Sequence, residues 1–239
     1  MSTPEGGFPP YGATVLVGRV LGLWRYPVKS LAGEPCDELE LDARGVAGDR
    51  VWALVDRDGK IASGKTTRRF RRVDGLLRHR STLAVEGEPL LHLADGRTVA
   101  PSDAVASELA GPGWRFAREA AVSHLDAGPV HLVTTATLEC LGAADGATVE
   151  TERLRPNVLL DSTVREEEWL GRRLRIGEIE LDVTGTTERC VMVGQEQREL
   201  AKRPRLLRTL VAWNDLQAGV YASVVRPGRI RVGERVYVV

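Results

Sequence analysis

Two short strings combine residue types that could do chemistry. In YPVKS, Pro27 ends an expected strand and leaves Lys29 and Ser30 at its mouth, where a cation and a hydroxyl suit an anion. In TTERC, Arg189 precedes Cys190, and a neighbouring cation favours the thiolate that binds metals. A lone cysteine is more often a small buried hydrophobe. The second string alone is therefore weak evidence for a site.

A third string, GKIASGKT at 59–66, satisfies the phosphate-binding pattern G-x-x-x-x-G-K-[ST] of P-loop proteins. A P-loop leaves a parallel strand and opens a helix. Here Gly59 is needed for a tight turn with Asp58, and the residues that follow have a weak helical pattern. We expect the match to be accidental, and a nucleotide-binding protein is the less favoured alternative.

A basic run, KTTRRFRR at 65–72, continues in residues 78–80 and raises the question of nucleic-acid binding. The chain of 239 residues has 33 Lys and Arg against 33 Asp and Glu, so no overall field recruits nucleic acid or an anionic membrane. We expect the run to be a solvated strand and loop near a cofactor entrance, or a docking surface for an acidic electron-transfer partner.

The three cysteines, 36, 140 and 190, are widely spaced and odd in number, which argues against a disulfide framework and favours a reducing compartment. Cys36 and Cys140 are expected to be structural, and the histidines at 79, 92, 124 and 131 lack metal-ligand spacing. Residues 1–13 have the composition of a disordered leader, and no apolar run reaches the roughly 18 residues of a membrane span. These features predict a cytoplasmic protein without a membrane partner.

The elements that must position these residues are mostly strands. Strand patterns occupy 15–24, 37–45, 154–161 and 172–185, and Asp-Gly pairs predict hairpins in 51–63 and 90–100. Residues 219–239 read as a closing hairpin punctuated by Pro227-Gly228 and Gly233. A short helix is expected at 102–109, and a strand from 130 feeds a helix capped by Thr134 or Thr135. The fold class is therefore mainly β with short helices (α+β), plausibly a barrel.

Four strings taken together resemble the MOSC family: LWRYPVKSLAG at 23–33, LRPNV at 154–158, TTERC at 186–190 and the closing segment 219–239. The resemblance runs from 15 to 239. It implies a MOSC-type β-barrel at 119–239, preceded by an interlocking N-terminal β-barrel domain at 14–118. The family includes the mitochondrial amidoxime-reducing component and bacterial proteins that detoxify hydroxylamino compounds.

The resemblance also implies a site for the molybdenum cofactor (molybdopterin), in which Cys190 is the metal ligand and the catalytic residue. The other cofactor-binding residues that it implies are Lys29, Ser30, Arg50, Thr134, Thr135, Arg155, Asn157 and Arg189. Arginine favours bidentate capture of a phosphate, and a helix that starts at Thr134 or Thr135 would add free N–H groups. Pyridoxal phosphate binding is a further family-level association.

The implied function is an oxidoreductase that reduces N-hydroxylated small molecules, such as hydroxylamines and amidoximes, without nucleic acid or membrane. Electrons would come from a separate ferredoxin or flavoprotein reductase, because three scattered cysteines cannot supply the four ligands of an iron–sulfur cluster. After Cys190 the chain reads VMVGQEQREL and lacks the acidic, threonine-rich segment of the mitochondrial proteins, which leaves the substrate class open. A sulfur carrier with a persulfide on Cys190 is the other alternative.

Overall fold

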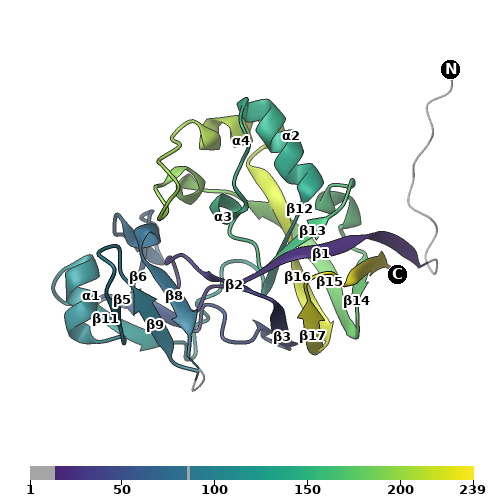
Figure 1. The fold of residues 1–239 in the computed structure, drawn as a ribbon. Helices are drawn as coiled ribbons and strands as arrows, with labels where there is room; N and C mark the ends of the chain where they lie inside the picture. The colour runs from purple at the N-terminus through teal and green to yellow at the C-terminus, as the bar shows by residue number, and fades with distance from the viewer. Residues whose placement is uncertain (1–13, 85–86) are drawn as a thin grey trace.

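The computed structural model describes residues 14–84 and 87–239, so the leader expected at 1–13 lies outside the described residues. Strands make up most of the regular structure, and the short α-helices lie at the edges of the sheets (Figure 1). The expected mainly β fold is confirmed. Among the described helices, none combines the length and the apolar character that crossing a membrane requires.

The largest sheet closes on itself as a barrel of seven strands. Their order is β13-β12-β16-β15-β14-β18-β1, and antiparallel pairing between β1 and β13 closes the ring. The barrel strands are β1 (Val15–Arg25), β12 (Val130–Thr134), β13 (Val158–Asp161), β14 (Arg173–Ile176), β15 (Ile179–Glu188), β16 (Gln217–Arg226) and β18 (Arg235–Val238), and β2 (Glu34–Cys36) extends the edge of β1. The first strand of the chain is therefore part of a barrel whose other strands all come after residue 129.

The sequence explains why β1 can take this position. Its register shifts between Leu16 and Gly18 and again between Val20 and Gly22, so the strand bends at both glycines. A Cβ at Gly18 would lie 2.2 Å from the carbonyl oxygen of Asp161, and only glycine allows β13 to approach this closely. The strand expected at 15–24 is present, and its two glycines account for the bend.

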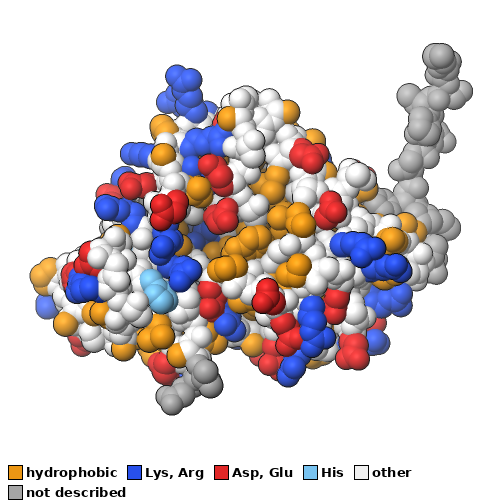
Figure 2. Space-filling view, viewed as in Figure 1, with side chains coloured by type: hydrophobic (Ala, Val, Ile, Leu, Met, Phe, Trp, Pro, Cys, Tyr) orange, Lys and Arg blue, Asp and Glu red, His pale blue; other side chains and the backbone are white. Residues whose placement is uncertain are grey.

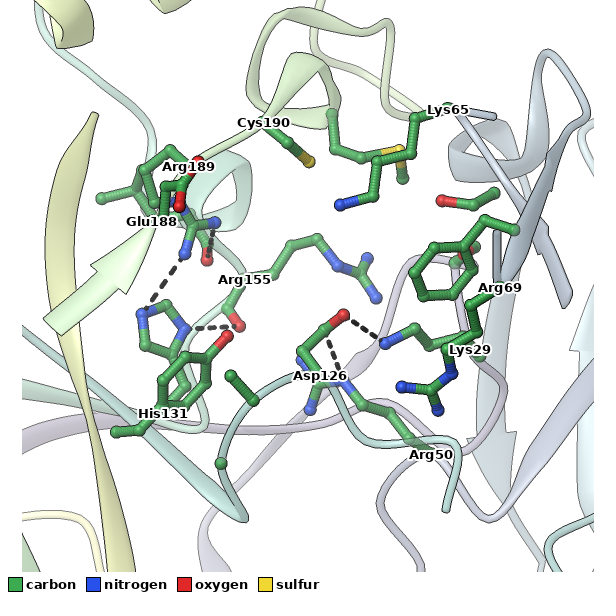
Figure 3. A pocket seen from close by; sticks show the side chains of 18 of the residues that line it. Lys29, Arg50, Lys65, Arg69, Asp126, His131, Arg155, Glu188, Arg189 and Cys190 are labelled. Atoms are coloured by element: carbon green, nitrogen blue, oxygen red, sulfur yellow. Dashed lines mark hydrogen bonds and ion pairs between the residues drawn. The ribbon is translucent and has the colours of Figure 1, made fainter. Parts of the chain in front are cut away.

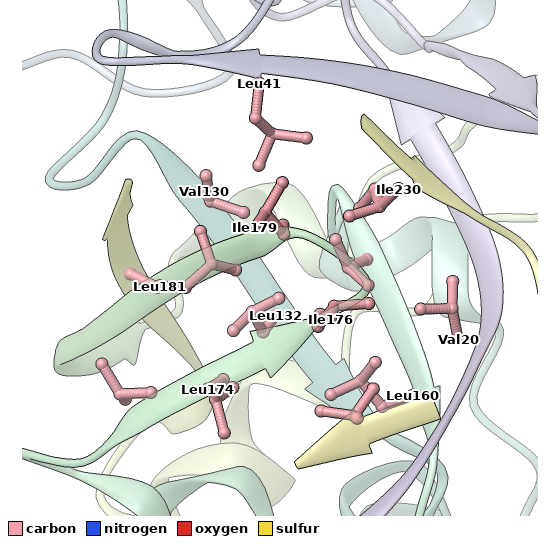
Figure 4. Packing of buried hydrophobic residues seen from close by; sticks show 14 of the residues in the cluster. Val20, Leu41, Val130, Leu132, Leu160, Leu174, Ile176, Ile179, Leu181 and Ile230 are labelled. Atoms are coloured by element: carbon pink, nitrogen blue, oxygen red, sulfur yellow. The ribbon is translucent and has the colours of Figure 1, made fainter. Parts of the chain in front are cut away.

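The barrel interior is a packed hydrophobic core (Figure 4). Alternation along β15 buries Ile179, Leu181 and Val183, as the period of a half-buried strand requires. These side chains meet those of the opposite strands, including Leu132 and Leu160. The centre of the barrel is therefore filled, and a ligand has to bind elsewhere.

The closing segment does not form the hairpin that its pattern predicted. Strand β16 is hydrogen-bonded to β15 on one edge and β12 on the other, which leaves no edge for the strand that follows. After Pro227, strand β17 (Gly228–Arg231) pairs with β3 (Glu38–Asp42) instead, and β3 also pairs with β4 (Gly45–Val46). This exchange between the two ends of the chain interlocks the N-terminal part with the barrel.

The N-terminal part consists of two small sheets around a second core that includes Leu31, Leu54 and Leu91. One sheet contains β5 (Trp52–Val55), β6 (Ile61–Ser63), β7 (Phe70–Arg72) and β11 (Arg115–Arg118), and the other contains β8 (Arg80–Leu83), β9 (Pro89–His92) and β10 (Thr98–Val99). Both expected hairpins are present, with Gly59 and Gly96 at positive φ. Helix α1 (Asp103–Ala110) starts after the side-chain cap of Ser102 and ends at Gly111, as expected.

Three helices cover one end of the barrel (Figure 1). They are α2 (Thr135–Asp145), α3 (Thr151–Leu154) and α4 (Leu206–Asn214), and they enclose a third core with η3 (Val191–Gly194). Thr134 caps α2 by accepting a hydrogen bond from the N–H of Thr137, as the sequence predicted. Cys190 directly precedes η3, so the helical end of the barrel holds the cysteine in place.

Candidate functional site

A cavity of about 560 Å³ lies between the barrel and the N-terminal part (Figure 3). Six cationic residues and two acidic residues line it: Lys29, Arg50, Lys65, Arg69, Arg155 and Arg189, against Asp126 and Glu188. Cys190 lines the same cavity, and its side chain points inward in Figure 3. On the face shown in Figure 2, by contrast, positive and negative side chains are interspersed. The positive charge is therefore concentrated in the cavity, where it favours an anion.

Lys29 and Arg50 converge on one carboxylate. Lys29 Nζ lies 2.6 Å from Oδ1 of Asp126, and Arg50 Nε lies 4.0 Å from Oδ2 of the same residue. Arg50 also pairs with the fully buried Asp49. Burial lowers the pKa of Lys29 to about 8, although the ion pair with Asp126 acts in the opposite direction. Burial raises the pKa of Asp126, but Lys29 and Arg50 more than offset this effect and hold the pKa well below its usual range.

Arg50 and Arg155 share an aromatic neighbour. The guanidinium carbon of Arg155 lies 4.4 Å from the centre of the Tyr26 ring, and that of Arg50 lies 4.7 Å from it. Arg155 Nη1 also donates to the carbonyl of Leu31 at 2.7 Å. Burial lowers the pKa of Arg155 to about 10, so the side chain is still charged at neutral pH. The ring contacts both arginines, and the carbonyl holds Arg155 without neutralising its charge.

Ser30, Arg50 and Arg155 share an uncommon backbone conformation. Their φ angles are 67°, 52° and 52°, in the left-handed region that side chains other than glycine rarely adopt. Each such residue costs on the order of 1–3 kcal/mol and persists where the surrounding structure enforces it, often at functional sites. The structure thus brings together three sequence-predicted residues and holds each in a strained conformation.

Arg189 reaches the cavity next to Cys190. Its Nη2 donates to the carbonyl of Leu154 at 2.6 Å, and its Nη1 lies 3.4 Å from Nε2 of His131. Burial and the charge of Arg189 hold the pKa of His131 well below its usual value, so the imidazole is neutral. Asn157 accepts a hydrogen bond from the N–H of His131 and donates to the carbonyl of Trp24. Its side chain therefore joins two strands at the cavity wall and has little left to offer a ligand.

The structure does not bring Thr134 and Thr135 to this cavity. Thr134 is fully buried, and its hydroxyl and backbone N–H both donate to Oε2 of Glu166 at 2.6 and 2.9 Å. Thr135 donates through its hydroxyl to the carbonyl of Ser162. A carboxylate of the protein itself thus occupies the start of α2, where the resemblance implied a phosphate. Neither threonine is retained as a cavity residue.

The cavity residues that the sequence reasoning did not select include Asp126, His131 and Lys65. Asp126 lies outside the predicted strands and helices, and His131 lacks ligand spacing, so neither had a usable signal. Lys65 did have one, since it is the lysine of the P-loop-like string. The Ile61–Ser63 strand runs through the middle of that string, and β7 follows it in place of a helix, so the match is accidental as expected.

The basic run divides between the cavity and the surface. Lys65 and Arg69 line the cavity, while Arg71 and Arg72 pair with nearby aspartates. Cys36 and Cys140 lie outside the cavity, and the three cysteines form no disulfide. Across 14–84 and 87–239, no three histidine, cysteine or carboxylate side chains are grouped to hold a metal ion. Cys190 is the thiol in the cavity that could bind a metal ion.

Comparison with known proteins adds a family context to this geometry. A family model described as the MOSC domain matches residues 118–237, and one described as the MOSC N-terminal beta barrel domain matches residues 17–105. The chain is 24% identical to mitochondrial amidoxime reducing component 2 of Rattus norvegicus and 23% identical to component 1 of Homo sapiens, in both cases over 92% of this chain and 83% of the relative.

Two further similarities differ in coverage. Molybdenum cofactor sulfurase of Drosophila grimshawi is 25% identical over 86% of this chain, which spans only 32% of the sulfurase. The solved structure of the YuaD protein from Bacillus subtilis shares the fold, with a TM-score of 0.50 and 14% identity over 95% of this chain and 97% of that one. The architecture in Figure 1 is therefore shared across most of the chain.

Proposed function

Because this chain belongs to the MOSC family and carries the family's N-terminal β-barrel domain, we propose that its cavity binds a molybdenum cofactor and that the protein reduces N-hydroxylated small molecules. The observation that carries the proposal is the position of Cys190, a thiol on the wall of a cavity in which six cationic residues face two acidic ones. The similarity to amidoxime reducing components supports the reaction type.

The residues present fit such a cofactor. Molybdenum is a soft metal that prefers a thiolate, which Cys190 can supply, and the phosphate of the pterin needs several converging cations. Lys29, Arg50 and Arg155 would hold that phosphate, with Ser30 as a hydroxyl donor. Arg189 has a buried Nε atom without a hydrogen-bond partner among the described residues, which is available to a bound group. When bound, the cofactor would supply the electrons that cleave an N–O bond.

The protein's own side chains would bind the cofactor and orient it. At pH 7 Lys29 stays protonated because its pKa is about 8, and it presents a positive charge beside Asp126. Neutral His131 and the Leu154 carbonyl fix the plane of the Arg189 guanidinium next to Cys190. Electrons would come from a separate ferredoxin or flavoprotein reductase. The exposed residues of the basic run at 65–72 would provide a docking surface for such a partner if its own surface is acidic.

The test is to produce the protein in a host that makes molybdopterin and to compare Cys190→Ala with Cys36→Ala and Cys140→Ala. We expect the wild type to hold molybdenum in stoichiometric amount. We expect Cys190→Ala to lower benzamidoxime reduction by reduced methyl viologen at least roughly a hundredfold, while part of the metal is retained, because loss of even outer-shell partners costs up to about that factor. The two control variants should keep the wild-type rate per folded molecule.

Other outcomes would identify the alternatives. Wild-type protein with no molybdenum but a persulfide on Cys190, detected by mass spectrometry, would favour a sulfur carrier, in keeping with the sulfurase relative. A Cys190→Ala variant that reduces benzamidoxime at the wild-type rate would show that the thiol is not the metal ligand. Absorption of a lysine-bound aldehyde cofactor would point to pyridoxal phosphate instead.

A further inference from the structure

Lys65 supplies the cavity with a cation that the proposed cofactor site does not use. Its side chain reaches into the cavity on the Cys190 side (Figure 3), and its ammonium lies 5.4 Å from the centre of the Phe70 ring. Lys29, in contrast, is paired with Asp126. Within the described part of the chain Lys65 makes no ion pair, so its charge is available to a ligand.

Contacts on both sides hold the Lys65 backbone in place. The N–H of Gly64 lies 3.2 Å from Sδ of Met192, and Nε2 of Gln195 donates to the Gly64 carbonyl at 3.2 Å. A Cβ at Gly64 would lie 2.1 Å from Nε2 of Gln195, so a side chain at this position would displace the Gln195 amide. On the other side of the loop, Arg69 donates to the carbonyl of Leu125 at 3.0 Å. Lys65 is therefore presented from a fixed backbone position opposite the segment that follows Cys190.

Lys65 also lies nearer to solvent than the three cations proposed to hold the phosphate. Lys29, Arg50 and Arg155 are 5%, 6% and 9% exposed, whereas Lys65 is partly exposed and the next three residues are exposed. An anion bound at Lys65 can therefore enter and leave with solvent, as a substrate must. Glu188, which lies beside Arg189 across the cavity, would repel a carboxylate from that wall and direct it to Lys65 (Figure 3).

We propose that Lys65 binds a carboxylate carried by the substrate, so that the cavity selects acidic N-hydroxylated compounds over neutral ones. This assignment rests on the proposed reductase function and names a substrate class for it. A neutral substrate would leave the Lys65 ammonium without a counter-ion in a partly enclosed space, whereas a carboxylate would form a charge-assisted hydrogen bond with it. Lys65 is thus a specificity-determining residue and not a group that takes part in N–O cleavage.

The first experiment compares 4-carboxybenzamidoxime with benzamidoxime, which differ only in the carboxylate. We expect wild-type kcat/KM to be at least about tenfold higher for the acid, through a lower KM, since a charged hydrogen bond contributes about 1.5–3 kcal/mol. In Lys65→Ala the ratio should fall close to one, in Lys65→Arg most of it should remain, and Arg68→Ala, a neighbouring exposed cation, should match the wild type. The assignment would be overturned if the wild type showed no preference for the acid. It would also be overturned if Lys65→Ala lost molybdenum and lost kcat/KM equally for the two substrates.

A second experiment separates this inference from the reductase proposal. Isothermal titration calorimetry on the purified protein would compare 4-carbamoylbenzoate with benzamide, neither of which has an N–O bond to cleave. We expect the acid to bind more tightly to the wild type, and the difference to disappear in Lys65→Ala. That result would support the carboxylate site even if no reductase activity were found, whereas equal binding of the two compounds would refute it even if the reductase activity were present.

Discussion

Nε2 of His131 lies 3.4 Å from Nη1 of Arg189, and Nδ1 of the same ring lies 3.2 Å from the carbonyl oxygen of Arg155. A carbonyl oxygen only accepts hydrogen bonds, so Nδ1 must carry the proton, and Nε2 is left to accept from the guanidinium. The neutral imidazole thus joins Arg155 to Arg189, the two arginines whose backbones flank the proposed cofactor site. Its protonation would break this link.

We therefore expect His131 to make wild-type stability fall in acid. The pKa of His131 is lowered in the folded state, so the unfolded chain binds the extra proton first, and folding stability is lost as the pH drops below about 6.5. His131→Gln keeps a donor and an acceptor but cannot be protonated. Urea unfolding of both proteins from pH 8 to pH 5 should show a smaller loss for the variant. Parallel pH profiles would contradict this role, since the other histidines are common to both proteins.

Lys29 should make anion binding depend on pH in the alkaline range. Its pKa of about 8 lies below the 10.5 of an ordinary lysine, so the positive charge is present at pH 7 and is lost as the pH rises through 8. Sulfate, which does not itself titrate there, should bind the cofactor-free protein more weakly at pH 9 than at pH 7. Lys29→Arg should remove most of that dependence, because arginine stays charged. Calorimetric titration at both pH values measures the effect.

Gly219 should tolerate substitution much less well than a glycine of matched conformation. Gly219 has φ of 92°, and a Cβ there would lie 2.2 Å from Nε2 of His131, whereas Gly96 has φ of 90° and no atom within 4 Å. Gly96→Ala should cost roughly 1–2 kcal/mol of unfolding free energy through backbone strain. Gly219→Ala adds overpacking that costs typically about 1–3 kcal/mol more. Similar values for the two variants in urea unfolding would show that the His131 contact is not tight.

Replacing the buried carboxylate of Glu166 should destabilise the fold more than replacing the exposed carboxylate of Glu168. Four donors reach it: the N–H and hydroxyl of Thr134, the hydroxyl of Thr137 and the N–H of Gly219. Glu166→Gln turns an amide NH₂ toward these donors and should lower the free energy of unfolding by about 2–4 kcal/mol, because hydrogen bonds to a charged acceptor are lost. Glu168→Gln, on the same turn but exposed, should change it by less than about 0.5 kcal/mol. Thermal and urea unfolding would compare the two.

Local signals in the sequence predicted most of the elements. Apolar alternation predicted the strand within 37–45, where β3 buries Leu39 and Leu41, and the Asp-Gly pairs predicted both hairpins. Partner choice was harder, because both edges of β16 are occupied by β12 and β15 and β17 pairs with β3 instead, and no local pattern carries that information. The expected closing hairpin was wrong for this reason.

The site was predictable to the same extent. The resemblance selected residues that converge on one cavity, including Lys29, Arg50 and Arg155, and the role of Cys190 as metal ligand stays a prediction. Thr134 was misplaced because its partner Glu166 comes from a distant turn. Asp126 was missed because its role depends on the ion pair with Lys29. Only the folded chain brings Oδ1 of Asp126 within 2.6 Å of Nζ of Lys29. The P-loop-like pattern at Lys65 was correctly predicted to be accidental. Because the pattern was set aside, Lys65 was not predicted as a cavity residue.

The position of β1 has a consequence for how the protein is made. Strand β1 leaves the ribosome first among the described strands, yet its partners in the barrel are β13 and β18, and Val15 pairs with Val238. At typical synthesis rates, β1 waits on the order of 10–45 s for β18. During that time the part of β1 that pairs with β18 has an unpaired edge that is open to other chains. The nascent protein should therefore depend on chaperones more than its size suggests, and the barrel segment produced alone should aggregate.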